Sequence, residues 1–286
     1  MYKALNYWVF GGFADNKTPY EFIDFAVEQG LDGVELTVGD ALSIDITAEE
    51  CKKITDYAKS KNIGIRTLAT GFHWGCSLAS PDEAERQQAL AFTRKYLQIA
   101  ANIGAEAVLL IPGYTRIAWD PSRPVVSYKT AWEKATESLK ELVVLAEQLN
   151  VKIALENVWN RFLLSPMEWK IFIDQFNSDY IGIYFDLGNC SIYGRPVDYI
   201  ELLGSRIKAI HVKNFMPSDC AGGLHGFGED LLQGEVDFAG VKEALIAMNY
   251  QGPLTAEMIP FSREPDPGLP DYDLSVATAQ KLKTLF

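Results

Sequence analysis

Basic residues are scarce in this chain, and their scarcity limits the partners that it can bind. Lys and Arg number 26 against 38 Asp and Glu in 286 residues, for a formal net charge of −12. Because binding to a nucleic-acid backbone needs a basic face, we expect no nucleic acid as a partner. A single phosphate group on a small substrate stays compatible with this charge, because one or two local cations are enough to hold it.

Long apolar runs and paired cysteines are also missing. No apolar run approaches the ~20 residues that cross a bilayer, and the N-terminal segment MYKALNYWVF lacks the layout of a signal peptide. The cysteines have no paired spacing, which favours reduced thiols over disulfides; they are Cys51, Cys76, Cys190 and Cys220. We therefore expect a cytoplasmic protein with no membrane partner.

The composition is that of a globular protein, with 48% apolar and 22% charged residues. Eight apolar, strand-like segments follow one another, at residues 4–10, 33–39, 63–71, 105–113, 151–158, 181–188, 207–214 and 252–259. The helix-like stretches between them end at residues that tolerate a left-handed cap, namely Gly30, Asn62, Gly104, Asn150, Asn177, Gly204 and Asn249. This alternation predicts a single (β/α)8 TIM barrel, one domain over residues 1–286.

Helix starts are marked by capping boxes at Thr18–Glu21, Thr47–Glu50, Ser80–Glu83 and Ser165–Glu168. All but the second also have proline at the first helical position. The longest irregular stretch, at about 214–236, is rich in glycine and follows the seventh strand-like segment. A loop of this length at the catalytic end of a barrel is typical of a lid or a binding loop.

Each of the last four strand-like segments carries an ionisable side chain near its C-terminal end. These side chains are Glu156, Asp186, His211 and Glu257. In a barrel of βα units the C-terminal strand ends converge on one mouth, where active sites lie. Three carboxylates and one imidazole at that mouth predict a site for a divalent cation.

Strand parity tests whether these side chains point into the barrel, because side chains alternate between the two faces of a strand. Glu156 shares its face with Lys152 and Ala154, whereas Ile153 and Leu155 face the other way, toward the helices. The same parity holds for Asp186, His211 and Glu257, and for Glu35 in the second segment. One such residue alone is more commonly a cap, a salt-bridge partner or a core residue, but three buried carboxylates together require a neutralising cation.

Four short motifs give the chain a resemblance to a known family. They are Ala154-Leu-Glu-Asn157, Phe185-Asp-Leu-Gly-Asn189, Ile210-His-Val-Lys213 and Thr255-Ala-Glu-Met258. With them the sequence resembles the xylose isomerase-like TIM barrel superfamily, in its sugar phosphate isomerase/epimerase branch, which includes ketose 3-epimerases and pentulose-5-phosphate 3-epimerases. The resemblance implies one divalent metal ion, most often Mn²⁺, on Glu156, Asp186, His211 and Glu257. The mixed oxygen and nitrogen ligands also suit Co²⁺, Zn²⁺ or Mg²⁺.

The family's chemistry is proton abstraction next to a carbonyl, through an enediolate that the metal ion stabilises. The resemblance gives Glu156 and Glu257 the roles of acid and base. It implies a sugar or sugar phosphate as substrate, and a homodimer or homotetramer as the assembly. At two positions the sequence departs from the family pattern, so the resemblance does not imply any particular substrate. Asn189 stands where many ketose 3-epimerases have histidine, and no arginine occurs between Asn214 and Gln251.

Several further residues are candidate substrate binders: Lys213, Asn189, His73, Trp8, Trp159, Arg161 and Glu35. Lys213 has an equal alternative as a salt-bridge partner of a ligand carboxylate, and for Glu35 a structural role is slightly favoured. For His73, Trp8 and Trp159 the alternative is packing beneath a loop.

Two other enzyme classes fit the same barrel. An inosose-type dehydratase, a lyase, would begin with the same proton abstraction and then expel hydroxide. An endonuclease IV-like DNA-repair enzyme would need a trinuclear zinc cluster rich in histidine, and the chain has three histidines in all. The sequence therefore favours an isomerase or epimerase, with the dehydratase as the alternative.

Overall fold

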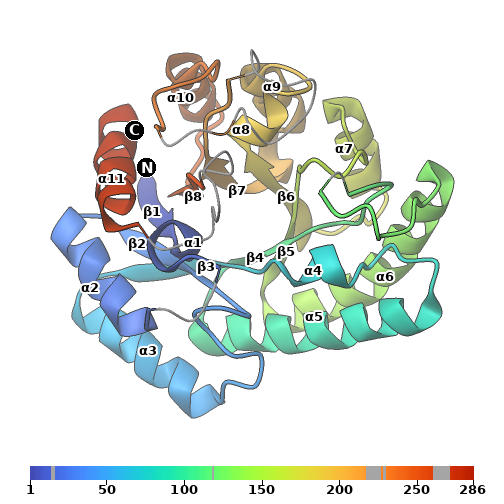
Figure 1. The fold of residues 1–286 in the computed structure, drawn as a ribbon, viewed down its shortest axis with the longest axis horizontal. Coiled ribbons are helices and arrows are strands. Elements are labelled where there is room, and N and C mark those ends of the chain that lie inside the picture. The colour runs from blue at the N-terminus through green and yellow to red at the C-terminus, as the bar shows by residue number, and fades with distance from the viewer. Residues whose placement is uncertain (14–16, 118, 217–226, 228–229, 260–270) are drawn as a thin grey trace.

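The computed structural model describes residues 1–13, 17–117, 119–216, 227, 230–259 and 271–286. Eight parallel strands close into one barrel in sequence order, with β1 paired to β8 (Figure 1). The strands are β1 Tyr2–Asn6, β2 Gly33–Thr37, β3 Gly64–Ala69, β4 Ala107–Leu110, β5 Lys152–Glu156, β6 Ile181–Asp186, β7 Ile207–Val212 and β8 Pro253–Ala256. The predicted TIM barrel is confirmed.

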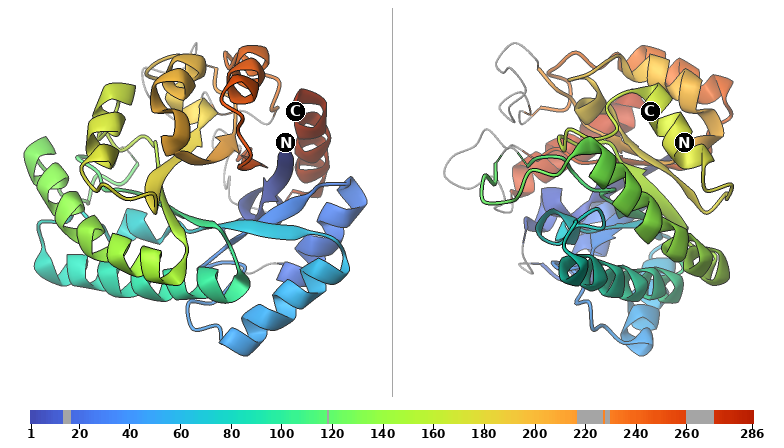
Figure 2. Two further views of the ribbon diagram at one scale, coloured as in Figure 1. Left: turned by 180° about the vertical axis from the view of Figure 1, so that it is seen from behind. Right: turned by 90° about the vertical axis from the view of Figure 1, so that its right-hand side faces the viewer.

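Helices form a layer around the barrel, as the two further views in Figure 2 show. The longer ones are α2 Pro19–Gln29, α3 Ala48–Ser60, α5 Glu83–Ile103, α6 Tyr128–Leu149, α7 Pro166–Asp174, α9 Pro196–Leu203, α10 Phe238–Ala247 and α11 Tyr272–Leu285. Short elements are α1 Tyr7–Gly11, α4 Phe72–Gly75, α8 Leu187–Cys190 and the 3₁₀ turn η1 Gly204–Arg206. Of these, α1 and α8 begin directly after a strand, and two residues separate α4 from β3, so all three lie at the C-terminal ends of the strands.

Three of the four predicted capping boxes are present, at Thr18, Thr47 and Ser165. The prediction for Ser80 is wrong by two residues. Helix α5 begins at Glu83, and the Asp82 side chain caps it by accepting hydrogen bonds from two backbone N–H groups. The Ser80 hydroxyl instead donates to the Glu85 carboxylate at 3.0 Å. A carboxylate next to the helix start satisfies the free N–H groups better than a more distant hydroxyl can.

The first predicted strand also ends earlier than its apolar sequence suggests. Residues Tyr7–Gly11 form helix α1, because the Asn6 side chain accepts a hydrogen bond from the Trp8 backbone N–H at 2.7 Å and so caps a helix there. Such a cap contributes about 1 kcal/mol. The turn of helix carries Trp8 over the barrel interior, where it packs against the residues that line it.

Two separate clusters of buried apolar residues confirm the predicted strand parity. The barrel interior holds a small cluster: Ala69, Ala107, Leu109, Ala154, Tyr184 and Ala209. The neighbours of these residues along the strands, such as Ile153 and Leu155, belong to the larger cluster between the barrel and the helices. The interior is therefore lined by small residues and one large tyrosine, which leaves its upper end to polar groups.

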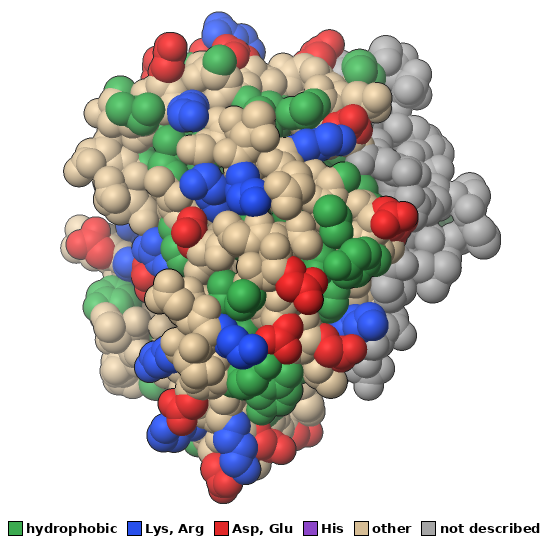
Figure 3. All heavy atoms as spheres, turned by 90° about the vertical axis from the view of Figure 1, so that its left-hand side faces the viewer, with side chains coloured by type: hydrophobic (Ala, Val, Ile, Leu, Met, Phe, Trp, Pro, Cys, Tyr) green, Lys and Arg blue, Asp and Glu red, His purple; other side chains and the backbone are tan. Residues whose placement is uncertain are grey.

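All seven residues predicted to end helices have positive φ. Gly30, Gly104 and Asn150 are left-handed caps, whereas Gly204 has φ 52° and ψ −128°, so the prediction of a left-handed cap is wrong there. Cys51, Cys76 and Cys190 are free thiols, while Cys220 and most of the predicted loop at 214–236 lie outside the described residues. None of the described helices combines the length and the apolar character that crossing a bilayer requires. Acidic and basic side chains are interspersed on the face formed by α2, α3 and α11 (Figure 3).

Candidate metal centre and active site

The four predicted metal ligands meet at the C-terminal mouth of the barrel. Glu156 and Asp186 end β5 and β6, His211 lies in β7, and Glu257 follows β8 directly. The parallel register places Asp186 opposite His211 and His211 opposite Thr255. One ligand atom from each of the four residues lies within 4.8 Å of the others, and all four side chains are buried. Residues more than 100 positions apart in sequence thus form one compact cluster.

The His211 ring presents one nitrogen to this cluster and the other to the barrel interior. Its Nδ1 lies 3.2 Å from Glu156 Oε1 and 3.7 Å from Glu257 Oε2. Its Nε2 lies 2.7 Å from Glu35 Oε1. Nδ1 is therefore the nitrogen that can bind a cation, and an Nε2–H can donate to Glu35. A carboxylate behind a metal-binding histidine is a common means of fixing its tautomer and orientation.

Glu35 is itself held in a fully buried network below the four residues. The Asn6 side-chain amide donates to Glu35 Oε1 at 2.7 Å, and the Tyr184 hydroxyl donates to Glu35 Oε2. Burial alone would raise the pKa of Glu35, but the charge and hydrogen bond of His211 lower it. The sequence analysis did not identify Asn6 or Tyr184 as functional residues. The parity of Tyr184, which it shares with Asp186, was the available signal.

The pKa shifts of the clustered side chains reflect an excess of buried negative charge, which favours the binding of a cation. Burial, followed by repulsion from Glu257 and Asp186, raises the pKa of Glu156 to about 7. Burial also raises the pKa of Asp186. Burial alone would lower the pKa of His211, but the surrounding carboxylates raise it well above its usual value. Protons thus balance the negative charge that a metal ion would otherwise neutralise.

One carboxylate oxygen points to the same conclusion. Asp186 Oδ1 accepts a hydrogen bond from the Asn189 backbone N–H at 2.7 Å, but the buried Asp186 Oδ2 accepts no hydrogen bond from the described residues. The Lys213 ammonium is 3.3 Å from that oxygen. Oxygen and nitrogen donors of this kind, in this number, fit a divalent cation.

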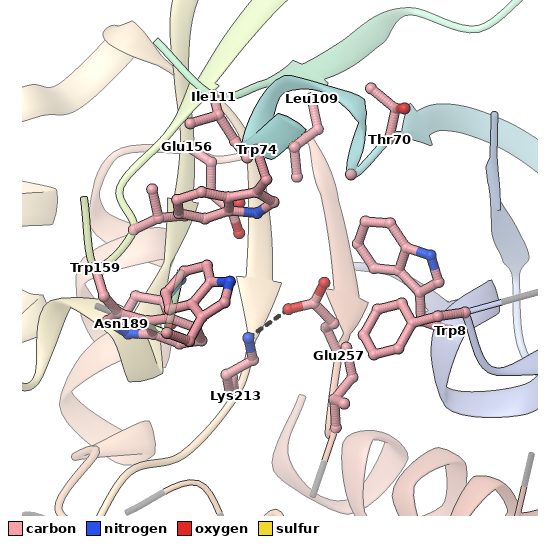
Figure 4. A pocket seen from close by; sticks show the side chains of 15 residues that line it. Trp8, Thr70, Trp74, Leu109, Ile111, Glu156, Trp159, Asn189, Lys213 and Glu257 are labelled. Carbon is pink, nitrogen blue, oxygen red and sulfur yellow. Dashed lines mark ion pairs between the residues drawn. The ribbon is translucent and has the colours of Figure 1, made fainter. Parts of the chain in front are cut away.

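Lys213 forms an ion pair with Glu257 (Figure 4). It forms a second ion pair with Asp186. Its ammonium also lies 5.5 Å from the centre of the Trp159 ring and 5.3 Å from that of Phe227. Burial alone would lower the pKa of Lys213, but the adjacent carboxylates raise it. The alternative role predicted for Lys213, an ion pair with ligand carboxylates, is therefore present in the structure.

Two asparagines fasten the ends of β5 and β6 to each other. The Asn157 side chain donates to the Asp186 carbonyl and accepts from the Asp186 N–H, each at 2.8 Å. The Asn189 side-chain amide then donates to the Asn157 carbonyl at 3.0 Å. Asn157 was part of a quoted motif without an assigned role, and the structure gives it one as a support for Asp186.

A cavity of about 400 Å³ opens above the four candidate metal ligands. Of these four residues, Glu156 and Glu257 line it, and Figure 4 shows both with aromatic rings around them. Four of the predicted substrate binders also line it: Trp8, Trp159, Asn189 and Lys213. Most of its apolar wall was not predicted from the sequence; it includes Phe13, Leu109, Ile111, Trp119 and Ile259. Leu109 lies in β4, where it shares the inward parity of Ala107. The other four lie in strand-to-helix loops, where no periodic pattern marks them.

The other predicted binders do not line this cavity. Glu35 lies below the four candidate metal ligands, as described. His73 is buried and packs edge-on against Phe72 and Phe92, which stack on each other. Its Nε2 is 2.9 Å from the Thr93 hydroxyl, and burial lowers its pKa to about 3. Arg161 is exposed on the loop after β5. The positions of His73 and Arg161 give their predicted roles no support.

Comparisons with known proteins agree with this architecture. The family model described as "Xylose isomerase-like TIM barrel" matches residues 23–279. The L-ribulose-5-phosphate 3-epimerase UlaE of Escherichia coli O1:K1 is 28% identical over 247 residues, which cover 83% of this chain and 81% of UlaE. A crystal structure of D-psicose 3-epimerase superposes with a TM-score of 0.79 at 18% identity and covers 99% of this chain and 97% of that one. The 3-keto-D-glucoside 4-epimerase YcjR of E. coli gives 0.77 at 16% identity and covers 99% of both chains. At such identities the two structural matches establish the fold alone.

Proposed function

The chain belongs to the xylose isomerase-like TIM barrel family, and we propose that it is a metal-dependent epimerase or isomerase of a sugar or sugar phosphate. The named epimerase relatives support this class of reaction. The proposed cofactor is one divalent ion, Mn²⁺ first, held by Glu156, Asp186, His211 and Glu257.

One observation carries the proposal. Among the four ligands, the two glutamates line the cavity, whereas Asp186 and His211 are fully buried beneath it. A reaction that moves a proton from one face of a carbon to the other needs two groups that reach the substrate. Glu156 and Glu257 meet this condition, and they come from β5 and β8, which are not neighbours in the barrel.

In this proposal the residues of the site have the following roles. One glutamate removes the proton from the carbon next to the carbonyl, and the other donates a proton to the opposite face of the resulting enediolate. A bound divalent cation would act as a Lewis acid toward the negative charge on the substrate oxygens. His211 and Asp186 keep their positions through Glu35 and Asn157. Lys213 orients the Glu257 carboxylate through their ion pair.

Solvent deuterium exchange tests this proposal, because it reports proton abstraction whatever the product. Purified protein with Mn²⁺ is incubated in D₂O with ketoses, ketose phosphates and keto-inositols, and label in the recovered sugar is measured. Accumulation of an unsaturated diketone from inosose would instead identify the dehydratase.

Substitutions at the two glutamates sharpen the result. Glu156→Gln and Glu257→Gln should each lower exchange by at least ~10²–10⁴-fold, the usual contribution of a general acid or base. Glu133→Gln, an exposed carboxylate on α6, is the matched control. Full exchange in either active-site variant would exclude the two-carboxylate scheme.

A further inference from the structure

Building on the proposed function, on which it rests, we propose that the substrate is an unphosphorylated keto sugar joined to a second neutral ring. The keto sugar would lie over the two glutamates, and the second ring would occupy a neighbouring cavity lined by aromatic side chains. Charge, shape and the continuity of the two cavities lead to this assignment.

The charge of the cavity disfavours a phosphate ester. In the part of the chain that the structure describes, Lys213 is the sole cationic side chain lining the main cavity. Its ammonium is engaged by Glu257 and Asp186 and covered by two aromatic rings. A phosphate dianion is normally held by Arg, Lys or several N–H donors aimed at it. The described lining offers instead tryptophan, phenylalanine and aliphatic side chains.

A second cavity continues from the first. It has a volume of about 250 Å³ and shares four lining residues with the main cavity: Trp8, Phe13, Thr70 and Gly71. Beyond them it is lined by Val38, Gly39, Asp40, Phe72 and Phe92. Asp40 is the one charged residue among its described lining residues, so this described lining offers no cationic side chain to a phosphate.

The shape and rigidity of this passage suit a flat, neutral ring. The Trp8 indole N–H donates to Asp40 Oδ2 at 2.7 Å, which fixes the orientation of the Trp8 ring. The Phe13 ring packs against it with 5.6 Å between centres. A sugar ring has an apolar C–H face that gains free energy when it is buried against such aromatic surfaces.

Gly71 lies where the two cavities join. A Cβ atom added there would lie 3.9 Å from the Trp8 ring, which is ordinary contact, and the Gly71 backbone has φ −87°, open to any residue. The substitution Gly71→Leu should therefore fold and place its side chain in the passage. Gly75→Leu is a matched control, because Gly75 is the exposed last residue of α4, the short helix that begins directly after Gly71, and has open space around it.

Three ketoses that differ at one position test the proposal: D-fructose, D-fructose 6-phosphate and isomaltulose, which carries a glucosyl ring on the same oxygen. The measurement is kcat/KM for solvent deuterium exchange with Mn²⁺. We expect isomaltulose to exceed the other two by about tenfold or more, the factor given by burying one further apolar ring face. Gly71→Leu should lower the ratio of isomaltulose to fructose about tenfold, while Gly75→Leu should leave this ratio as it is in the parent protein.

The outcomes separate the two proposals. A preference for fructose 6-phosphate, equal rates with fructose and isomaltulose, or an unchanged ratio in a folded Gly71→Leu protein would overturn the assignment of a ring-bearing substrate and leave the epimerase proposal standing. Exchange with none of the three sugars would also overturn this assignment, whereas the epimerase proposal is overturned only if the wider panel of ketoses, ketose phosphates and keto-inositols shows no exchange. Thermal melting of each variant establishes whether it is folded.

Discussion

The two halves of the barrel mouth differ in the chemistry of their side chains. The half formed by β5 to β8 supplies the four ionisable residues, which are held in place by hydrogen bonds and ion pairs. The half formed by β1 to β4 supplies mainly apolar groups to the same cavity, such as Trp8, Trp74, Leu109 and Trp119. Under the proposed function, the β5–β8 half carries out the reaction (the reactive half) and the β1–β4 half binds the sugar (the recognition half). The Glu35 side chain, from β2, lies beneath the cavity and hydrogen-bonds to His211 of the reactive half.

The largest expected effect comes from breaking the reactive half directly. His211→Ala should weaken Mn²⁺ binding by more than ~100-fold, beyond the loss caused by removing a supporting residue. The reason is that the variant lacks the one nitrogen among the four candidate ligands, which lies next to the Glu156 and Glu257 carboxylates. Elemental analysis after dialysis measures the metal that is retained. Stoichiometric metal in the dialysed variant would contradict the proposed ligand set.

A smaller effect is expected from the residue that links the two halves. Glu35→Gln keeps the size of the side chain but removes the charge behind His211, so Mn²⁺ affinity should fall ~10–100-fold. Titration calorimetry with Mn²⁺ measures the change independently of turnover. The control is Glu106→Gln, which alters a carboxylate paired with Arg66 and placed away from the cluster. Equal affinity in the Glu35 variant and the control would show that Glu35 does not support the metal site.

The pH dependence of Mn²⁺ binding tests the reactive half further. Metal uptake must displace a proton from His211, whose pKa is raised, so affinity should increase with pH by up to about tenfold per unit. Below about pH 7 Glu156 also holds a proton, because its pKa is raised to about 7, and the dependence should steepen there. The logarithm of the Mn²⁺ dissociation constant, measured from pH 5.5 to 8.5, gives the slope. A flat profile would contradict these proton equilibria.

A substitution in the recognition half should have the smallest effect, and it should change the KM for the sugar and not the affinity for Mn²⁺. Trp119 is 43% exposed and packs edge-on against Trp74 and Trp159. Trp119→Ala should raise the KM for the sugar by a factor of a few to about ten, because part of one apolar surface is removed. Mn²⁺ affinity should stay within error of the parent protein. Tyr20→Ala, of similar exposure on α2, is the control.

Local patterns predicted much of this structure. Capping residues, left-handed caps and strand alternation are properties of a few consecutive residues, so the eight strands and the direction of Glu156 and Asp186 could be predicted from sequence. The wrong predictions also had local causes, in which two residues or two types of structure compete for the same position. Asp82 displaced Ser80 as a cap, and the Asn6 side chain converted the end of an apolar strand into helix α1.

Relations between distant segments could not be predicted in the same way. The contact between Tyr184 and Glu35 joins residues 149 positions apart, and no periodicity in the chain signals it. Trp119 and Phe13 reach the cavity from loops, whose course depends on the elements that they connect. His73 shows the reverse case, since a loop position that suited a substrate binder became a buried core residue.

The barrel and the four residues at its mouth follow from local patterns, because strand period and strand order place those side chains once a parallel barrel closes. Which of the four line the cavity, which nitrogen of His211 meets the carboxylates and what covers them follow from packing between distant segments. These properties depend on distances between strands and loops that touch only after the chain has closed on itself.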